Sequence, residues 1–393
     1  MPARDKKKPV TAAVQPQLLR WARERVPLTT AALAKKVGLK EERVIEWEAT
    51  GKLTLAQLEK VAGKTYTPVG YLFLPIPPRE DLPIADFRRV AGQPVGRPSP
   101  DLLDTIYVCQ QRQNWYREHL VAEGERPLPF VGSARLTEQP AIVAGRIRAV
   151  IGLDDAWSGS VRNTNEAFRS LVEKVEAACI LVIRNGVVGN NNYRKLSVSE
   201  FRGFALSDEY APLVFINAGD WPAAKIFTLA HELGHIWLGH SGVSDADMES
   251  DHQEEHFCNE VAAEVLAPMA EFRDAWRKTA DPLDEARRLA DLFKVSMLVA
   301  LIRARAAGLI SQKKFDALYE AEREGFPPTE SKTGEKGGGD FYRTQGSRLS
   351  KRFARAVIVS ALEGRTTFTE AFHLLGLREG TFDEYARKLG VVH

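Results

Sequence analysis

Apolar side chains recur every three or four residues along the first part of the chain, a spacing typical of amphipathic helices. From residue 17 to about 74 the pattern is interrupted by Pro27, Gly38 and Gly51, so it predicts several short helices rather than one long helix. So many short helices in so small a stretch are typical of a helix-turn-helix module, here with Gly38 at the turn. The predicted buried positions are Leu18, Leu19, Ala22, Leu33, Val37, Val44, Ile45, Leu55, Leu58 and Val61.

The pattern changes along the rest of the chain. Helical stretches are predicted at about 102–122, 141–151 and 165–178, followed by strand-like apolar runs at 179–183, 186–188, 204–206 and 213–216. The Asn185-Gly186 pair between two apolar runs predicts a hairpin. The strand that begins at Pro212 fits either an edge strand, which a peptide substrate could extend, or an ordinary core strand. Two helices, near 221–238 and 254–266, are predicted next.

These elements predict a predominantly helical α+β protein with a small sheet and several domains. Glycine and proline are concentrated at 326–347, a composition typical of a flexible linker. The predicted organisation begins with a helix-turn-helix domain with a basic arm at 1–77 and a helical connecting region at 78–160. A domain with the sheet and most of the histidines follows at 161–325, and the linker at 326–347 leads to a helical C-terminal segment at 348–393.

Composition narrows the class of protein. The 393 residues carry 54 Lys+Arg and 52 Asp+Glu, and this balance of +2 excludes a strongly basic polyelectrolyte binder. No apolar run approaches the roughly 18 residues of a membrane span, and no apolar segment of a signal peptide follows the basic start. The three cysteines are far apart, so no disulfide framework is expected. We therefore expect a cytoplasmic protein without membrane attachment.

Histidine is the most informative residue type. Five of the eight histidines lie between positions 231 and 256, and two of them belong to the sequence His231-Glu232-Leu233-Gly234-His235. Four residues make just over one helical turn, so both imidazoles project from one face and can bind one metal ion. Glu232 projects about 100° away around the helix axis, where it can act as a general base without ligating the metal. This is the HExxH arrangement of zinc peptidases.

A catalytic zinc ion needs a third protein ligand. The metzincin pattern would require glycine at 238 and histidine at 241, and Leu238 and Ser241 exclude it. The next predicted helix offers carboxylates, and stepping back three or four residues along its apolar stripe from Cys258 reaches Glu255 and Glu254. A carboxylate at the head of a buried stripe needs a neutralising partner, so Glu255 is the favoured ligand. Glu254 is the second candidate, with a possible role as a helix-capping charge, whereas Glu260 and Glu264 fall on the other face.

Four sequence runs, Phe227–His235, Glu255–Pro268, Glu200–Leu206 and Pro212–Asn217, together resemble the ImmA/IrrE family of metallopeptidases. The stretch Leu28–Glu48 resembles the XRE helix-turn-helix family, and this combination is familiar from ImmA/IrrE proteins. The resemblance implies a gluzincin-like fold and a Zn²⁺ site held by His231, His235 and Glu255. It also implies that the protein cleaves a repressor of the XRE type and so relieves repression.

The expected mechanism assigns further roles to nearby side chains. Glu232 would accept a proton from the attacking water and pass it to the leaving amine. A further donor is needed for the charge of the transition state, and the candidates are His240, Tyr193 and Tyr210. Asn259, four residues after Glu255, could orient that carboxylate. His252 and His256 are expected to lie outside the ligand set.

The N-terminal module has two possible partners, DNA and protein. Its second helix would present Lys40, Arg43 and three glutamates, an unfavourable balance for a surface that faces phosphates. Lys35 and Lys36 add positive charge nearby, so weak DNA binding through residues 17–74 and docking of a partner repressor are both retained. The alternative to a regulatory endopeptidase is a DNA-binding regulator, or a toxin–antitoxin component, with a sensory or structural metal site.

Overall fold

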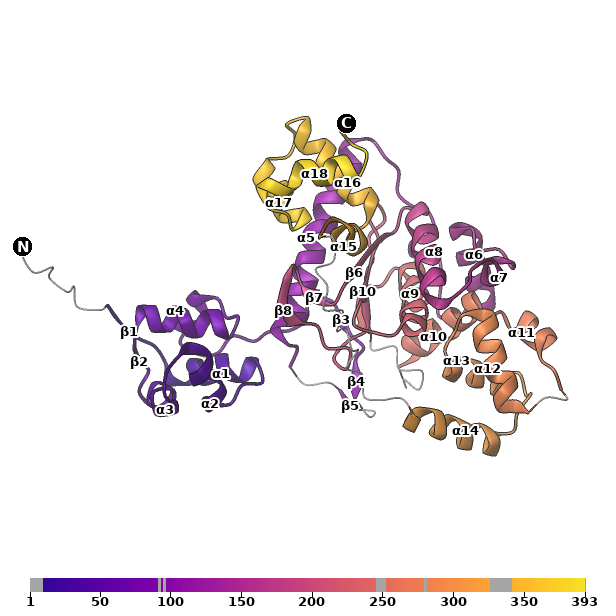
Figure 1. The fold of residues 1–393 in the computed structure, drawn as a ribbon, viewed down its shortest axis with the longest axis horizontal. Coiled ribbons are helices and arrows are strands. Elements are labelled where there is room, and N and C mark those ends of the chain that lie inside the picture. Colours follow the sequence, from indigo (N-terminus) through magenta and orange to yellow (C-terminus); the bar gives the residue numbers. More distant parts are fainter. Residues whose placement is uncertain are drawn as a thin grey trace, which may run out of the picture. The chain divides into compact units, whose positions relative to one another are not determined.

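The computed structural model describes residues 10–90, 93–94, 97–244, 252–278, 281–325 and 341–392 (Figure 1). They belong to two compact units, one of residues 1–83 and 96–104, the other of residues 84–95 and 105–393. The described chain is mostly helical with a small mixed sheet, which confirms the predicted α+β class.

The first unit is a small helical bundle closed by a short hairpin. Helices α1 (Pro16–Arg25), α2 (Thr30–Val37), α3 (Glu41–Thr50) and α4 (Leu55–Lys64) are followed by the 3-10 helix η1 (Val69–Phe73). Strands β1 (Thr11–Ala13) and β2 (Lys52–Thr54) pair antiparallel. Gly38, in the left-handed conformation, ends α2, and α3 begins three residues later. The two helices thus form a closely joined pair, while the assignment to the XRE family stays a prediction.

Most predicted core positions of this unit are buried, but Ile45 and Leu55 are exposed. Ile45 directly follows the buried Val44, so it points about 100° away around the helix axis and leaves 52% of its surface in solvent. Leu55 is the first residue of α4, where the helix has no preceding turn to cover it. The indole of Trp47, not Ile45, fills the core at this end of α3.

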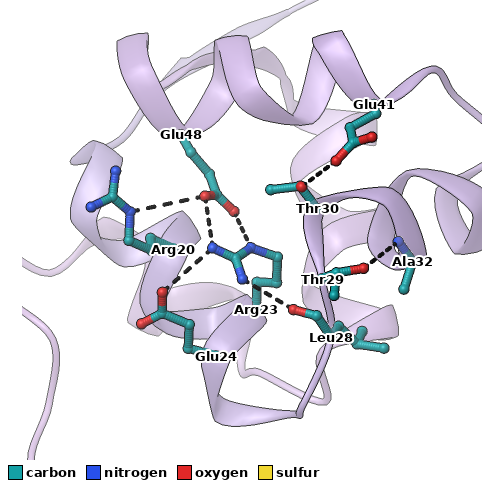
Figure 2. A network of polar contacts seen from close by, with 9 residues as sticks. All are labelled: Arg20, Arg23, Glu24, Leu28, Thr29, Thr30, Ala32, Glu41 and Glu48. Atoms are coloured by element: carbon teal, nitrogen blue, oxygen red, sulfur yellow. Dashed lines mark hydrogen bonds and ion pairs between the residues drawn. The ribbon is translucent and has the colours of Figure 1, made fainter.

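A buried ion pair connects α1 and α3. Glu48 is 8% exposed and accepts two hydrogen bonds from Arg23, from Nε at 2.6 Å and from Nη2 at 3.0 Å. Arg23 also donates to the carbonyl of Leu28 at 3.0 Å, so its guanidinium fixes the loop that precedes α2 (Figure 2). At the other end of the network Thr30 donates to Glu41, and Thr29 caps α2 by accepting from Ala32 N.

We expect Glu48→Ala to loosen the N-terminal unit. The substitution removes the main partner of the Arg23 guanidinium, whose side chain is 13% exposed and keeps hydrogen bonds to Leu28 O and Glu24, so we expect a loss of about 2–4 kcal/mol of local stability, somewhat less than for a fully buried pair. The matched control is Glu46→Ala on the same helix, because Glu46 pairs with Arg43 at a half-exposed position and should contribute under about 0.5 kcal/mol. Hydrogen exchange of peptides from α3, measured in the full chain, compares the two variants. Equal protection in both would contradict a stabilising role for the buried pair.

The second unit is built on a five-stranded mixed sheet with the order β3-β11-β9-β10-β6. β10 pairs parallel with β6 and antiparallel with β9, while β11 pairs antiparallel with β9 and parallel with β3. The strands are β3 (Ala85–Asp86), β6 (Leu181–Asn185), β9 (Gly203–Leu206), β10 (Leu213–Asn217) and β11 (Gly242–Ser244).

Two strand predictions are corrected. β10 lies inside the sheet, so the edge-strand interpretation of the run after Pro212 is wrong. Pro212 precedes the first strand residue and contributes only its carbonyl, which accepts from Leu181 N at 2.8 Å, so no ladder hydrogen bond is lost.

The hairpin predicted at Asn185-Gly186 is also wrong, because β6 pairs with β10 while β7 (Val187–Val188) pairs with β8 (Asn191–Lys195). Short strands β4 (Arg89–Val90) and β5 (Gln93–Pro94) form a further pair.

Helices cover the sheet and form the main core. α9 (Pro222–Leu238) packs against β9 and β10, α8 (Thr164–Ala177) packs against α9 and β6, and α10 (Gln253–Leu266) packs against α9 and α6 (Pro140–Ile151) (Figure 1). The connecting helices are α5 (Pro100–Ala122) and α7 (Trp157–Ser160). Beyond α10 the chain continues through α11 (Met269–Ala275), α12 (Pro282–Phe293), α13 (Met297–Ala306) and α14 (Gln312–Gly325).

The C-terminal helices pack on α5 and on the strand region. They are α15 (Phe341–Arg348), α16 (Lys351–Leu362), α17 (Phe368–Leu375), η2 (Glu379–Thr381) and α18 (Phe382–Lys388). Arg112 Nε of α5 donates to the carbonyl of Leu374 at 2.9 Å, and Trp115 contacts Phe353 edge to face. Most of the predicted linker lies outside the described residues, but its last part, 341–347, is helical. Gln345 anchors this helix by donating to Leu375 O at 2.6 Å.

None of the helices in the described part of the chain is long and apolar enough to cross a membrane.

Candidate metal centre

Helix α9 carries the HExxH sequence through the core. Pro222 occupies its first turn and Trp221 its N-cap position, and Asp220 accepts from Trp221 N at 2.8 Å. Every residue from Ile226 to Leu238 is buried, so this part of the helix is surrounded by the protein core on all sides. His231, Glu232 and His235 are its buried ionisable residues. His231 and His235 lie one turn apart, with their Nε2 atoms 3.1 Å from each other.

Gly234 permits α10 to approach α9 closely. A Cβ atom at this position would lie 3.0 Å from Sγ and 3.2 Å from Cβ of Cys258, closer than side chains normally pack. The contact fixes α10 at Cys258, and Glu255 is three residues, almost one turn, before it on the same face. The packing therefore brings a carboxylate from α10 to the two imidazoles of α9.

The three side chains meet in a completely buried cluster. Glu255 Oε2 lies 3.3 Å from His231 Nε2, and Glu255 Oε1 lies 3.0 Å from His235 Nε2. His231, His235 and Glu255 form a group of candidate metal ligands whose atoms all lie within 4.8 Å of one another, and each residue is 0% exposed. A His-His-carboxylate set of this kind is a typical catalytic metal site, with room for a further ligand. The donor set therefore fits a metal ion.

Polar partners orient both imidazoles. His231 Nδ1 lies 2.9 Å from Asn259 Oδ1, and His235 Nδ1 lies 3.0 Å from Glu254 Oε1. When each Nδ1–H donates to its oxygen, each Nε2 presents a lone pair towards Glu255, which is the arrangement that a metal ligand needs. Asn259, which we expected to orient Glu255, thus contacts a histidine of the cluster, and Glu254 lies beside the ligand group as an acceptor for His235.

His240 is connected to the centre through Glu254. Its Nδ1 lies 3.0 Å from Glu254 Oε1, the same oxygen that faces His235, and half of its side chain is exposed. Burial disfavours the charged form of Glu254, but hydrogen bonds from His235 and His240 outweigh burial and lower the pKa of Glu254 below its usual value. A carboxylate held ionised in this way strengthens the orientation of His235.

Glu232 lies beside the cluster and is 0% exposed. Within the part of the chain that the structure describes, its two buried carboxylate oxygens make no hydrogen bond of standard geometry, although Ser244 is close enough to lower its pKa. The side chain lies against β9, where Gly203 leaves space; a Cβ atom there would be 3.0 Å from Glu232 Oε1. Burial raises the pKa of Glu232 to about 7, against the lowering effect of the two imidazoles. A buried carboxylate with no structural partner is typical of a reactive group.

Residues 85–88 cover one side of the centre, a feature that the sequence did not predict. The Phe87 ring stacks on the His235 imidazole with 5.4 Å between centroids and an interplanar angle of 7°. Gly242 of β11 makes room for this ring, because a Cβ atom there would lie 2.2 Å from the ring edge. Ser244 Oγ approaches His235 Nε2 to 3.3 Å from the same strand. Phe87 lies in a proline-rich stretch with no helical or strand period, so no sequence signal marked it.

The remaining predicted residues lie elsewhere. Tyr193 is 95% exposed on β8, and Tyr210 packs against Arg117, whose guanidinium carbon lies 5.7 Å from its ring centre. Among the described residues, neither tyrosine hydrogen-bonds to the histidines or to Glu255. His256 is exposed beside Glu260 at 3.9 Å, whereas the His252 ring contacts Phe87 at 4.9 Å.

The candidate DNA-binding residues of the first unit are exposed. They are Lys35 and Lys36 in the last turn of α2, Lys40 at the N-cap of α3, and Arg43. Arg43 donates to Glu46 at 2.6 Å, so its charge is already paired.

Comparison with protein families agrees with the geometry. Residues 190–305 match the IrrE N-terminal-like domain of the Peptidase M78 family, and this region contains all three side chains of the cluster and Glu232. Residues 349–388 match a domain of unknown function (DUF8813). A search of curated proteins gave no significant match. The matched domain and the buried His-His-Glu group define an enzyme, a metallopeptidase of the HExxH class.

Proposed function

We propose that the protein is a regulatory zinc-dependent endopeptidase that cleaves an XRE-type transcriptional repressor and thereby controls a stress, phage or mobile-element response. The observation that carries the proposal is the meeting of two oriented Nε2 atoms and a buried carboxylate beside the unpaired Glu232. His231, His235 and Glu255 would hold the ion. Nitrogen and carboxylate ligands without thiolates suit Zn²⁺. Zinc bound there supplies Lewis acidity, polarising the scissile carbonyl and lowering the pKa of water to about 7.

The protein's own residues carry out the proton transfers in this proposal. Glu232 takes a proton from the attacking water and delivers it to the nitrogen of the leaving amine, as its free carboxylate oxygens permit. Asn259 and Glu254 keep the imidazoles in one tautomer during turnover. His240, half-exposed and connected to the centre through Glu254, is the best placed of the three donor candidates for stabilising negative charge.

The acidic surface of α3 supports a protein partner. Glu41, Glu42 and Glu46 are all exposed on this helix, and Arg43 is paired with Glu46. A surface of this charge repels phosphates, whereas it suits a basic protein surface such as that of a DNA-binding repressor. The alternative, a DNA-binding regulator with a structural metal site, leaves Glu232 without a role, because a structural site has no use for a general base.

The test is cleavage of purified candidate repressors by the zinc-loaded protein, followed on gels with and without a chelator. Defined fragments that disappear with chelator support the proposal, and the same fragments in chelator contradict it. DNA binding is measured in parallel with the repressor's operator. Tight, sequence-specific operator binding without cleavage would favour the alternative.

We further propose that the described conformation is latent. The ligand group and Glu232 are fully buried, so a peptide can reach them only if a covering segment moves. The segment 85–88 is held over the centre by β3–β11 pairing and by Arg88, a buried side chain that donates to Asp86 at 2.7 Å and Glu200 at 3.2 Å. The segment contacts the metal centre through Phe87, whose ring stacks on His235. Displacement of this segment would free the edge of β11 for a substrate strand.

Phe87→Ala is expected to raise peptide turnover about tenfold. The substitution removes an aromatic stacking contact and its burial, together about 1.4 kcal/mol or more of stabilisation of the closed form. The readout is the rate of peptide cleavage at equal zinc content, and the matched control is Phe73→Ala at an exposed phenylalanine of the first unit. Unchanged or reduced turnover at full zinc occupancy would contradict the latent state.

A further inference from the structure

A cavity of about 930 Å³, whose lining contains none of the candidate metal ligands, lies at the carboxyl ends of β6 and β10. The wall contains Asn185, the last residue of β6, with Gly186 after it, and Ala218 and Gly219, which follow β10. The other walls come from α8, from β8 and the loop after it, from the first turn of α9, and from the end of α15. The volume falls within the range of roughly 300–1,000 Å³ typical of small-molecule sites.

The lining of this cavity has one sign of charge. Among the described residues no Asp or Glu side chain lines it, and the ionisable lining residues are all cationic: Arg169, Arg184, Lys195, Lys225 and Arg348. Glu176 and Glu173 act electrostatically on Arg184, and Asp220 acts on Lys225, yet none of these acids is part of the wall. The cations come from separate segments, so the fold and not a local charge run brings them together.

Several of these cations are partly removed from water. Arg184 and Lys225 both lie over the Phe168 ring, at 5.6 and 5.5 Å from its centre. Arg184 Nε is buried and has no hydrogen-bond partner among the described residues. Burial lowers the pKa of Arg184, Lys225 and Arg348. Grouping like charges in a desolvated wall is unfavourable unless an anion enters the cavity.

We propose that this cavity binds a polyphosphorylated small molecule of nucleotide size. Five cationic side chains around one cavity suit a ligand with several negative charges better than a single carboxylate. Asn165 and Lys225 belong to the first turns of α8 and α9, and the helix dipoles add positive potential at these ends.

The wall favours a small phosphorylated ligand over single-stranded nucleic acid. Sites for single strands present open aromatic faces on which bases stack. Phe168 is the aromatic residue of this wall, it is buried, and two cations lie over its ring. Phosphate groups can pair with those cations, whereas a base would have to compete with them for the buried ring.

The ligand would join two parts of the same unit. Lys225 lies on α9, six residues before His231, and Arg348 ends α15, which leads into the C-terminal helices. A bound polyphosphate that contacts both residues stabilises the folded chain by mass action, so the melting temperature should rise with the logarithm of its concentration once that concentration exceeds the dissociation constant.

The test is isothermal titration of the full chain with ATP, pyrophosphate and inorganic phosphate. We expect one ATP per chain, weaker binding of inorganic phosphate, and a loss of about tenfold or more in ATP affinity for Lys225→Gln. Lys195→Gln, at an exposed wall position, should weaken binding in the same direction without affecting the fold. The matched control is Lys313→Gln, an exposed lysine of α14 outside the cavity, which should bind ATP like the wild type.

Three results would overturn the proposal. The first is no binding of ATP or pyrophosphate at millimolar concentration, and the second is unchanged ATP affinity in both Lys225→Gln and Lys195→Gln. The third is a single-stranded oligonucleotide that binds far more tightly than ATP and loses affinity in the same two variants, which would identify a nucleic-acid site. None of these measurements depends on peptidase activity.

Discussion

Glu255→Gln is expected to lose the metal ion. The amide keeps the shape of the carboxylate but removes the negative charge that faces both Nε2 atoms, at 3.3 Å from His231 and 3.0 Å from His235. Even loss of a partner that merely orients a ligand typically lowers metal affinity 10–100-fold, so loss of the ligand itself should lower zinc affinity by at least about 100-fold. Zinc content after dialysis, measured by mass spectrometry, checks this result.

The matched control for this variant is on the same helix. Glu260 lies on the exposed face of α10 beside His256, and Glu260→Gln should retain one zinc ion per chain. Retention of zinc by Glu255→Gln at the wild-type level would exclude the proposed ligand set. Circular dichroism shows in parallel that both variants keep their helical content.

Glu232→Gln is expected to keep the metal ion and lose turnover. Among the described residues the carboxylate makes no hydrogen bond of standard geometry, and only Ser244 is near enough to lower its pKa, so the substitution removes a proton acceptor with little loss of structural interaction. General acid–base catalysis contributes about 10²–10⁴-fold, and the cleavage rate should fall by that factor. The measurement is single-turnover cleavage at confirmed zinc occupancy. A variant that cleaves at the wild-type rate would show that another group accepts the proton.

The positions of His231, Glu232 and His235 relative to one another could be predicted from the sequence. The three residues lie on one helix, so their relative positions follow from the helical period alone. Predicting Glu255 required one further inference, because the apolar stripe first had to identify the inner face of α10. In the structure the close contact between Gly234 and Cys258 holds that face against α9. Regular helices with a continuous apolar face carry this kind of information in their sequence.

Other features depend on pairing between distant segments and could not be predicted. Whether β10 is an edge or an interior strand depends on which strands flank it, and its sequence is compatible with both. Phe87 reaches His235 only because the two-residue strand β3 pairs with β11, far along the chain. The basic cavity likewise collects its cations from segments between residues 165 and 348. None of these arrangements leaves a period in the sequence.

Fragment analysis by mass spectrometry tests the central claim most directly. Zinc-loaded wild-type protein, its Phe87→Ala form and the Glu232→Gln variant are each incubated with candidate XRE-type repressors, with and without chelator. We expect one defined cut in a repressor, faster with Phe87→Ala, and absent both with chelator and with Glu232→Gln. The same cut in the presence of chelator or by Glu232→Gln would contradict a metal-dependent cleavage in which Glu232 is the base, and the absence of any cut by the wild type and Phe87→Ala alike would contradict repressor cleavage.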